Sequence, residues 1–483
     1  MGSEMCIRDR SYIKTIMINS RKLQITGLSM LSLVGSGCTD KNGSIENGVR
    51  PNIVLFLADD IGAECFGCMG GVSYDTHIID SLAEKSLFFP NMHAQPLSSP
   101  SRVQLMTGLY NDKNYVCFGY MNDDEPTFSQ LAQQAGYTTG MFGKWQLGRS
   151  REMPTRLGWD EWCLFQLEVY KEFDGPTGTD RYANCMMDNH GHYEYSIYGP
   201  DGFESAAFEF LDKQKDSDKP FLLYYSTPLV HTPHTPTPDS ESWDLDFAGR
   251  FQKDTANFKD MVAYLDKKVG RMIDRLKRNG QWENTIFIFT SDNGTSTRIV
   301  SQMADGTLRR GGKGDPRGIG TSVPLIICWG DKLEPRESQR LVDFTDFFPT
   351  FADAMCIAVP EEYGLDGVSL FPEIVGEKPL EKEISLMHYN PLWPVAAAPY
   401  ASRAARTTEW KYYWDGRFYN TKTDFMEEHP IDIDTCSNEI KTIYAKLKAK
   451  VEECPNFYPD MPGAPRRGNY GTFYDFAEPN NPF

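Results

Sequence analysis

Two adjacent carboxylates, Asp59 and Asp60, directly follow an apolar run in the chain. Residues 53–57 read IVLFL, and such a continuous run predicts a strand buried on both faces, as in a parallel sheet. Open α/β sheets bind ligands at the carboxyl ends of their strands. Two carboxylates there are costly unless a cation neutralises them, and hard cations prefer oxygen ligands. Asp59 and Asp60 are therefore candidate metal ligands, with a solvated acidic pair at a strand end as the alternative.

His231 is a candidate general acid because of its position between two prolines at the end of another apolar run. Residues 221–225 read FLLYY and predict a strand, and Pro228 and Pro233 stand on either side of the histidine. Proline fixes φ, so the imidazole would be held rigidly at the ligand-binding edge of the sheet. A histidine there can transfer a proton to a leaving group. The alternative is a core histidine whose ring nitrogens are bonded to the backbone.

A serine-rich stretch at residues 98–108 reads SSPSRVQLMTG. A Ser/Pro turn leading into a helix would explain SSPSR by itself. The whole stretch, however, resembles the signature of the type I sulfatases, (C/S)xPSRxxLxTG, a family of the alkaline phosphatase superfamily that includes the arylsulfatase A-like enzymes. In that family the first residue, here Ser98, is oxidised by a dedicated maturase to Cα-formylglycine. A serine at this position implies a serine-type maturase.

The resemblance implies a covalent mechanism. One hydroxyl of the formylglycine hydrate attacks the sulfur of a sulfate monoester, and the other then expels sulfate by C–O cleavage. Arg102, whose planar guanidinium can donate to two acceptors at once, is expected to bridge the formylglycine oxygen and neighbouring acidic groups.

Residues 143–148 read GKWQLG, which is similar to the family motif GKWHLG. Lys144 matches the lysine that reaches the sulfate, but Gln146 stands where the family has histidine. Glutamine can form hydrogen bonds, yet it cannot exchange a proton near neutral pH. Three interpretations follow: another base acts, the enzyme is slower, or the chain is a catalytically silent homologue. We favour the first because the surrounding motif is intact.

Two further motifs complete the resemblance, which covers roughly residues 51–451. Residues 291–294 read SDNG, and the family uses this motif for the second half of its metal site. The metal ligands implied are Asp59, Asp60, Asp292, Asn293 and the formylglycine made from Ser98. All offer oxygens, which suits Ca²⁺, or Mg²⁺, and disfavours zinc. Residues 311–314 read GGKG, so Lys313 matches the family's second sulfate-binding lysine, and His231 matches its histidine at the substrate.

The elements that must position these residues read as an α/β fold. We expect a large mixed, mostly parallel sheet sandwiched by helices, with the apolar stripe of a helix at residues 257–279 packed on it. Residues 51–382 would form the catalytic domain. Alternating aromatic segments from residue 383 predict a smaller α+β subdomain on an antiparallel sheet, at residues 383–483. Residues 168–200 show no periodicity and are expected to be an irregular, substrate-facing insertion or a plain surface loop.

The first 50 residues are interpreted as a non-native leader at residues 1–16 followed by a signal peptide and linker. A short basic segment, an apolar run at residues 23–34 and the box GSGC ending at Cys38 resemble a bacterial lipoprotein signal. The run is too short to span a membrane. We therefore expect an exported, periplasmic or outer-membrane-tethered protein with a lipid anchor at Cys38, and ordinary export with nearby cleavage as the alternative.

The net charge limits the classes of binding partner, and the cysteine spacing bears on metal binding and disulfides. The formal net charge of −18 argues against nucleic acid, so any anion site must be locally basic. Cys65 and Cys68 form a lone CxxC and are interpreted as free thiols. Cys436 and Cys454 flank a predicted helix, and a bridge between them is left open.

Export suggests a sulfated carbohydrate as the substrate. A phosphate ester hydrolase of the same superfamily and a catalytically silent binder of sulfated glycans remain the two alternatives.

Overall fold

The computed structural model describes residues 50–115, 118–122, 124–148, 151–165, 181–243, 250, 253–391 and 401–454. All of them belong to one compact unit, residues 42–483. The predicted leader, the signal segment with Cys38 and the tail from residue 455 lie outside the described residues, and so does the first part of the 168–200 insertion. Within the described part, no helix is long and apolar enough to cross a membrane.

A large sheet of 11 strands organises the chain, in the order β12-β2-β11-β8-β1-β7-β3-β4-β5-β6 with β13 beside β2. The central strands β8, β1, β7, β3 and β4 run parallel. Antiparallel strands flank them on both sides, which confirms the predicted mixed, mostly parallel sheet. The strands are β1 (Asn52–Ala58), β2 (Leu87–His93), β3 (Thr138–Lys144), β4 (Glu161–Phe165), β5 (Ala183–Asn189), β6 (His192–Tyr198), β7 (Phe221–Ser226), β8 (Thr285–Ser291), β11 (Ser322–Trp329), β12 (Arg336–Glu337) and β13 (Val342–Asp343).

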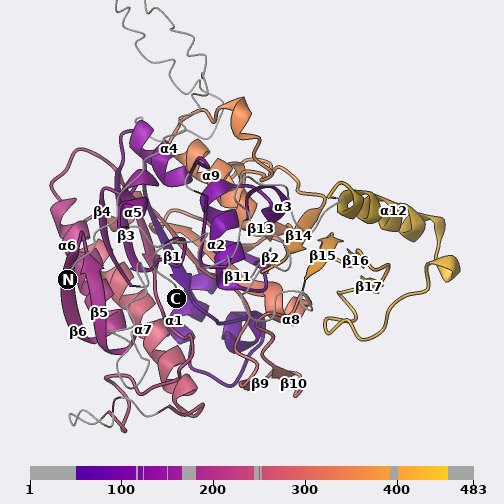
Figure 1. Ribbon diagram of the computed structural model, residues 1–483, viewed down its shortest axis with the longest axis horizontal. Coiled ribbons are helices and arrows are strands. Elements are labelled where there is room, and N and C mark those ends of the chain that lie inside the picture. The colour runs from indigo at the N-terminus through magenta and orange to yellow at the C-terminus, as the bar shows by residue number, and fades with distance from the viewer. Residues whose placement is uncertain are drawn as a thin grey trace, which may run out of the picture. The chain divides into compact units, whose positions relative to one another are not determined.

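Helices cover both faces of this sheet (Figure 1). Strand β1 shows why its apolar run is continuous, since alternate side chains enter different cores. Leu55 and Leu57 pack with α2 (Ser98–Thr107), α4 (Phe128–Gln134) and α9 (Phe347–Ala354). Val54 and Phe56 pack on the other face with α1 (His77–Glu84), α6 (Gly199–Lys213) and α7 (Asn257–Arg278).

The predicted amphipathic helix is α7, and it buries the stripe read from the sequence. Phe258, Leu265 and Met272 are among its buried residues. The helix ends at Arg278, and Gly280 follows with φ +71°. Shorter elements complete the connections: η2 (Ala63–Cys65), η3 (Gly67–Met69), α3 (Asn111–Asn114), α5 (Met153–Arg156), η5 (Trp282–Asn284), the hairpin β9 (Val300–Gln302) and β10 (Leu308–Arg310), α8 (Gly318–Thr321), η6 (Phe344–Asp346), η7 (Glu361–Tyr363), α10 (Phe371–Ile374) and η8 (Ile433–Thr435).

A separate four-stranded antiparallel sheet follows residue 383, as predicted. Its strands are consecutive: β14 (Ser385–Tyr389), β15 (Ser402–Arg406), β16 (Trp410–Tyr413) and β17 (Phe418–Asn420). Helix α12 (Asn438–Glu452) is capped by Ser437 and buries Leu447 and Val451 beside this sheet. Cys436 and Cys454 are free thiols, and Cys454 Sγ lies 3.1 Å from Asp112 Oδ2. The domain boundary at residue 383 stays a prediction.

The expectation of an irregular segment at residues 168–200 is wrong for its described part. Residues 183–198 form the antiparallel hairpin β5–β6 at the edge of the large sheet. Strand β6 exposes most of its side chains, including Tyr195 and Ile197. Its conformation depends on pairing with β5, which periodicity within one segment does not reveal.

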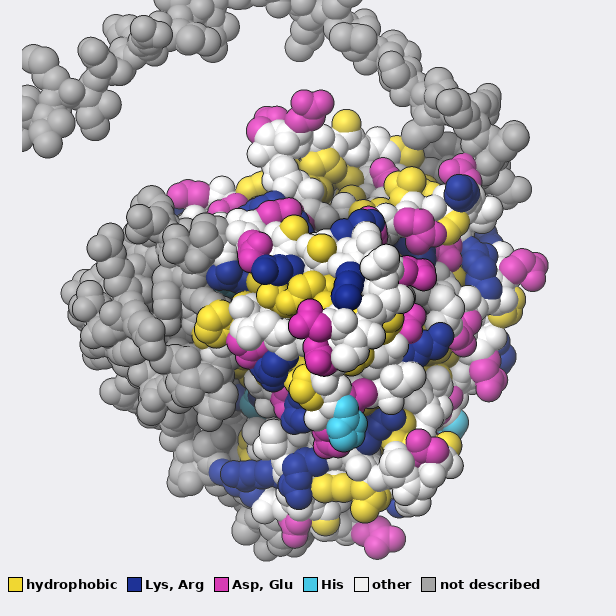
Figure 2. Space-filling model, turned by 90° about the vertical axis from the view of Figure 1, so that its right-hand side faces the viewer, with side chains coloured by type: hydrophobic (Ala, Val, Ile, Leu, Met, Phe, Trp, Pro, Cys, Tyr) yellow, Lys and Arg dark blue, Asp and Glu magenta, His cyan; other side chains and the backbone are white. Residues whose placement is uncertain are grey.

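Charges of both signs are interspersed on the face seen in Figure 2. Dark blue Lys and Arg side chains alternate there with magenta Asp and Glu. The formal net charge of −18 is therefore not gathered into one acidic field on this face.

Candidate active site

The register between two parallel strands brings the predicted metal ligands together. Ala58 of β1 pairs with Ser291 of β8, so the residues that follow each strand emerge side by side. The Asp60 backbone N–H donates to Asp292 Oδ1 at 3.1 Å. Asn293 Nδ2 donates to Asp60 Oδ1 at 2.9 Å. Asp59, Asp60, Asp292 and Asn293 are each at most 1% exposed.

Ser98 is the first residue of α2 and points into this group. Its Oγ donates toward Asn293 Oδ1 at 3.1 Å and Asp59 Oδ1 at 3.3 Å. Lys144 Nζ, at the end of β3, donates to the same Oγ at 3.0 Å. The N-terminus of a helix carries partial positive charge, so α2 also favours an anion beside Ser98.

Arg102 lies one turn further along α2 and is fully buried. Its Nε and Nη2 both donate to Asp292 Oδ2, at 3.1 and 2.8 Å. Its Nη1 donates to Tyr224 Oη at 3.2 Å and also to Ser226 Oγ. The expected contact with an acidic group is present, and the structure gives Arg102 the role of fixing Asp292. Sequence reasoning missed Tyr224 and Ser226, which come from β7.

Lys144 and Asp59 form a completely buried ion pair. Lys144 Nζ lies 2.7 and 2.9 Å from the two carboxylate oxygens of Asp59. Burial raises the pKa of Asp59 to about 7, although Lys144 acts in the opposite direction. Burial likewise lowers the pKa of Lys144 to about 8, against the effect of Asp59. A cation bound to Asp59 would favour its carboxylate form and so lower its pKa.

His231 and Lys313 meet on the Asp60 side of the group. The segment that carries His231 is tied to β1, since the Asp59 N–H donates to the Leu229 carbonyl at 2.7 Å. Lys313 Nζ lies 2.6 Å from Asp60 Oδ2 and 3.0 Å from His231 Nε2.

The imidazole of His231 is held in its neutral form. Burial lowers the pKa of His231 well below its usual value, and Arg181 and Lys313 act in the same direction. Arg181 contacts Nδ1 of the ring. Sequence reasoning missed Arg181, because no motif or periodicity marks the stretch in which it lies.

Gln146 also lies at the β3 end of the site, two residues after Lys144. Its backbone adopts φ +54°, a left-handed conformation. Its side-chain Oε1 is buried, and no hydrogen-bond partner for it lies in the described part of the chain.

The donor set fits a hard divalent cation. Ligand atoms of Asp59, Asp60 and His231 all lie within 4.8 Å of one another, and Asp292 and Asn293 add further oxygens beside them. Sequence reasoning had not placed His231 this close to the metal ligands. The carboxylates of Asp59, Asp60 and Asp292 are matched by Lys144, Lys313 and Arg102. A divalent cation would therefore make the site net positive, which a bound sulfate group can offset.

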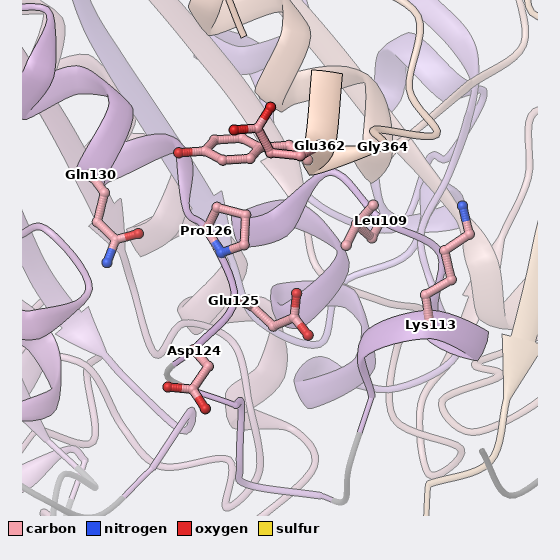
Figure 3. Close-up of a pocket in the computed structure, with 9 residues that line it drawn as sticks. Leu109, Lys113, Asp124, Glu125, Pro126, Gln130, Glu362 and Gly364 are labelled. Carbon is pink, nitrogen blue, oxygen red and sulfur yellow. The ribbon is translucent and has the colours of Figure 1, made fainter. Parts of the chain in front are cut away.

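A recess with a mainly acidic lining lies away from these residues (Figure 3). Its volume is about 630 Å³, and it is lined by Leu109, Lys113, Asp124, Glu125, Pro126, Gln130, Glu362, Tyr363 and Gly364. Three of these side chains are carboxylates, and the single cation, Lys113, already pairs with Asp366. Like charges repel, so this recess is unsuited to a sulfate ester.

A family model for sulfatases matches residues 51–357. The chain belongs to the sulfatase family. The predicted family and the predicted class of enzyme, a sulfuric ester hydrolase, are thereby confirmed.

Named relatives of this sulfatase are sulfatases too. The uncharacterized sulfatase YdeN of Escherichia coli (strain K12) is 31% identical over 345 residues, which are 65% of this chain and 58% of that protein. An N-acetylgalactosamine-6-O-sulfatase of Bacteroides thetaiotaomicron is 26% identical over 438 residues, which are 74% and 83% of the two chains. Human arylsulfatase A is 28% identical over 359 residues, or 68% of each chain.

Solved structures share the fold. Ps i-CgsB, crystallised in complex with k-i-k-neocarrahexaose, superposes with a TM-score of 0.70 at 25% identity, covering 89% of this sulfatase and 98% of that chain. The phosphonate monoester hydrolase of Agrobacterium radiobacter superposes with a TM-score of 0.58 at 19% identity, covering 84% and 95%. At that identity the likeness concerns the fold alone.

Proposed function

We propose that this sulfatase hydrolyses a sulfate monoester on a carbohydrate, using a formylglycine made from Ser98 and a divalent cation, Ca²⁺ or Mg²⁺. The observation that carries the proposal is the position of Ser98 Oγ, within 3.3 Å of Asp59, Asn293 and Lys144 at once. The cation would be held by Asp59, Asp60, Asp292 and Asn293, where it would supply Lewis-acid polarisation of a sulfate oxygen.

The residues around Ser98 divide the remaining work. Lys144 is placed to stabilise negative charge that develops on the oxygen carried by residue 98. Arg102 keeps Asp292 in position and neutralises it. Gln146 would accept a hydrogen bond from a sugar hydroxyl once its side chain turns, because its buried Oε1 has no partner among the described residues.

Lys313 and His231 together form the proposed acid. The ammonium of Lys313 donates to His231 Nε2 at 3.0 Å, so the neutral imidazole accepts at that atom. After proton transfer along this bond, the leaving oxygen of the ester would have to replace Lys313 Nζ as the partner of Nε2 in order to take the proton. This refines the expectation that His231 acts alone, because a neutral ring with an accepting Nε2 has no proton to give there.

A sulfated carbohydrate is favoured by the activities for which the relatives are named. The Bacteroides thetaiotaomicron relative is named an N-acetylgalactosamine-6-O-sulfatase, and Ps i-CgsB was solved with a neocarrahexaose. Export, a lipid anchor at Cys38 and processing by a serine-type maturase belong to the same proposal, motivated by the segment at residues 17–38 and by the serine at position 98.

The test is the mass of the tryptic peptide covering residues 86–102, from protein made together with a serine-type maturase. We expect a loss of two hydrogens at Ser98, with a known serine-type sulfatase as the positive control. The converted protein should release sulfate from a panel of sulfated sugars, and Ser98→Ala should abolish that release. A converted control beside an unconverted Ser98 would remove the nucleophile and reject the proposal.

Phosphoryl transfer is the second candidate function, because a phosphonate monoester hydrolase shares the fold and a cationic clamp accepts either group. Turnover of an aryl sulfate and the matched aryl phosphate separates the two activities. A silent glycan binder, suggested by Gln146, would bind sulfated glycans equally well with Ser98→Ala and would turn over neither ester.

A further inference from the structure

A small cavity lies between the large sheet and the four-stranded C-terminal sheet. Its volume is about 20 Å³. The polar side chains that line it are His93, Gln95, Thr321, Ser385, Arg406 and Lys411. None of them contributes to the metal ligands or to the contacts of the Ser98 side chain described above.

The guanidinium of Arg406 is buried at this cavity without an acidic partner. Its Nε donates to the Thr407 carbonyl at 3.1 Å, its Nη1 to His93 Nδ1 at 3.0 Å and its Nη2 to Thr421 Oγ1 at 3.3 Å. All three acceptors are uncharged. No ion pair within 4.0 Å is formed by Arg406 in the part of the chain that the structure describes. Burial lowers the pKa of Arg406 to about 10, so it remains charged at neutral pH.

Lys411 is a second buried cation at this cavity, and it pairs with the carboxylate of Glu427. Lys411 Nζ lies 3.0 Å from Glu427 Oε1 and also donates to the Pro316 carbonyl at 2.6 Å. Glu427 further accepts from the Tyr413 hydroxyl and from the Gly318 N–H. Burial lowers the pKa of Lys411 to about 8, so it is mostly protonated at neutral pH. Arg406, Lys411 and Glu427 together then carry one unit of positive charge in excess, and burying such a charge is unfavourable unless a counter-charge is present.

Two other lining side chains, His93 and Gln95, can donate to an anion. His93 is neutral, because burial together with Arg406 and Lys411 lowers its pKa well below the usual value. Since His93 Nδ1 accepts from Arg406, the ring proton resides on Nε2. Gln95 Oε1 and Gln104 Nε2 have no hydrogen-bond partners among the residues that the structure describes, while Gln95 Nε2 donates to Gln104 Oε1. Turning both amides over keeps that bond and replaces the orphan Gln95 oxygen by an N–H donor.

We propose that this cavity binds one monatomic anion, chloride or bromide, as the counter-ion of Arg406. A volume of about 20 Å³ exceeds the roughly 10–15 Å³ that one water requires, so the cavity holds one particle and is too small for a tetrahedral sulfate. A halide is larger than a water, so the lining side chains would have to move apart slightly to admit it. A water would satisfy the N–H donors but would leave the positive charge uncompensated.

An anion here would join two parts of the chain. Arg406 belongs to β15 of the C-terminal sheet, whereas His93 ends β2 and Gln95 leads into the helix that begins at Ser98. The Gln95 N–H also donates to Ser101 Oγ at 3.0 Å. The bound anion would therefore stabilise the C-terminal sheet against the segment that positions Ser98.

The first test is thermal unfolding of the full chain at constant ionic strength. Replacing sodium gluconate by sodium chloride or sodium bromide should raise the midpoint by about 2–4 °C with a saturable dose dependence. Any saturable effect of sodium sulfate should arise at the active site and should therefore persist in Arg406→Gln. Arg406→Gln should abolish the halide effect, while Arg310→Gln, at an exposed arginine on β10, should retain it.

Crystals of the unaltered protein grown in sodium bromide give the second test, which does not depend on whether Arg406→Gln folds. An anomalous bromide peak within hydrogen-bonding distance of Arg406 and His93 is expected. A peak that appears only at high soaking concentration, without a halide effect at physiological salt, would show an adventitious ion only. Either that result or a water in place of bromide overturns the proposal.

Discussion

Lys144 and Ser98 share a buried hydrogen bond, from Nζ to Oγ at 3.0 Å, although 46 positions separate them in the chain. Lys144 ends the parallel strand β3, and Ser98 begins helix α2 on one face of the sheet. Because Asp59 contacts both side chains, the lysine links the proposed nucleophile to the proposed metal ligands. This link suggests the first prediction.

Lys144→Gln should lower kcat of the formylglycine-bearing enzyme by about 10²–10³-fold, the cost of removing a preorganised donor to developing charge. Steady-state turnover of an aryl sulfate measures the change. The matched control is Lys113→Gln at the acidic recess, which should leave kcat unaltered because that lysine pairs with Asp366 instead. Equal losses in the two variants would place the recess in the reaction and contradict the assignment.

Gln146→His tests whether the glutamine marks a lost acid or base. Histidine tolerates the left-handed φ of +54° better than most residues, so the variant should fold. If another group already transfers the proton, kcat should change less than about tenfold, whereas supplying a missing acid–base group would raise it by 10²–10⁴-fold. We expect the small change, together with a higher KM for Gln146→Ala on a sulfated sugar. Steady-state kinetics of both variants measures these changes. A large gain in kcat for Gln146→His would show that the native site lacks its acid.

Metal removal should affect stability as well as activity. Chelation should abolish turnover and lower the thermal midpoint, because a ligand bound only by the folded state stabilises it by mass action. Adding Ca²⁺ or Mg²⁺ back should restore both. Asp292→Asn should require more cation for the same recovery, since one of the clustered carboxylates is lost. A thermal midpoint that changes with neither chelator nor added cation would contradict the assignment of Asp59, Asp60, Asp292 and Asn293 as ligands.

Asp346 should make the free energy of unfolding fall as the pH rises from about 4 to 6. Burial raises the pKa of Asp346 from 3.8 to about 6, with Lys382, 2.8 Å away, acting in the opposite direction. Between those values the folded state binds more protons than the unfolded state, so this contribution is present at low pH and lost above pH 6. The effect of Asp346→Asn on the free energy of unfolding, relative to the native protein, should therefore be about 1–3 kcal/mol more stabilising at pH 7 than at pH 4. Denaturant unfolding at the two pH values measures this difference.

The neighbouring carboxyl provides a control of opposite sign. Burial opposes ionisation of Asp343, but Lys382 and hydrogen bonds hold the pKa of that carboxyl below its usual value. Its contribution is present at neutral pH and is lost as the pH falls. That loss occurs below about pH 3.8, the pKa of the unfolded state, so Asp343→Asn should be more harmful at pH 7 than at about pH 2–3. The same pH trend in both variants would refute the difference in charge state between the two carboxyls.

Much of the site could be located in the sequence because its residues follow buried strands. Asp59, Lys144, His231 and Asp292 each come at or just after the end of a strand that is apolar on both faces. Parallel strands present such ends at one edge of the sheet, so the apolar runs before Asp59 and His231 predicted a shared position for these two. Lys144 and Asp292 were predicted from the resemblance to the sulfatase motifs. The motif around Ser98 and the amphipathic stripe of α7 were equally readable, because both are properties of one continuous segment.

Tertiary structure decided the features that depend on partners remote in the chain. Arg102 holds Asp292 and Tyr224, Arg181 reaches His231, and β6 owes its extended form to β5. The charge states of Asp59 and His231 likewise follow from burial and from cations on other elements. No local pattern marks Arg406 as a buried cation without an acid, because its environment is assembled from β2, β15, β16 and the segment before α8. The amino-acid sequence determines which chemical groups are present and in what order. The distances between them, their burial and the net charge of each site depend on how the two sheets pack.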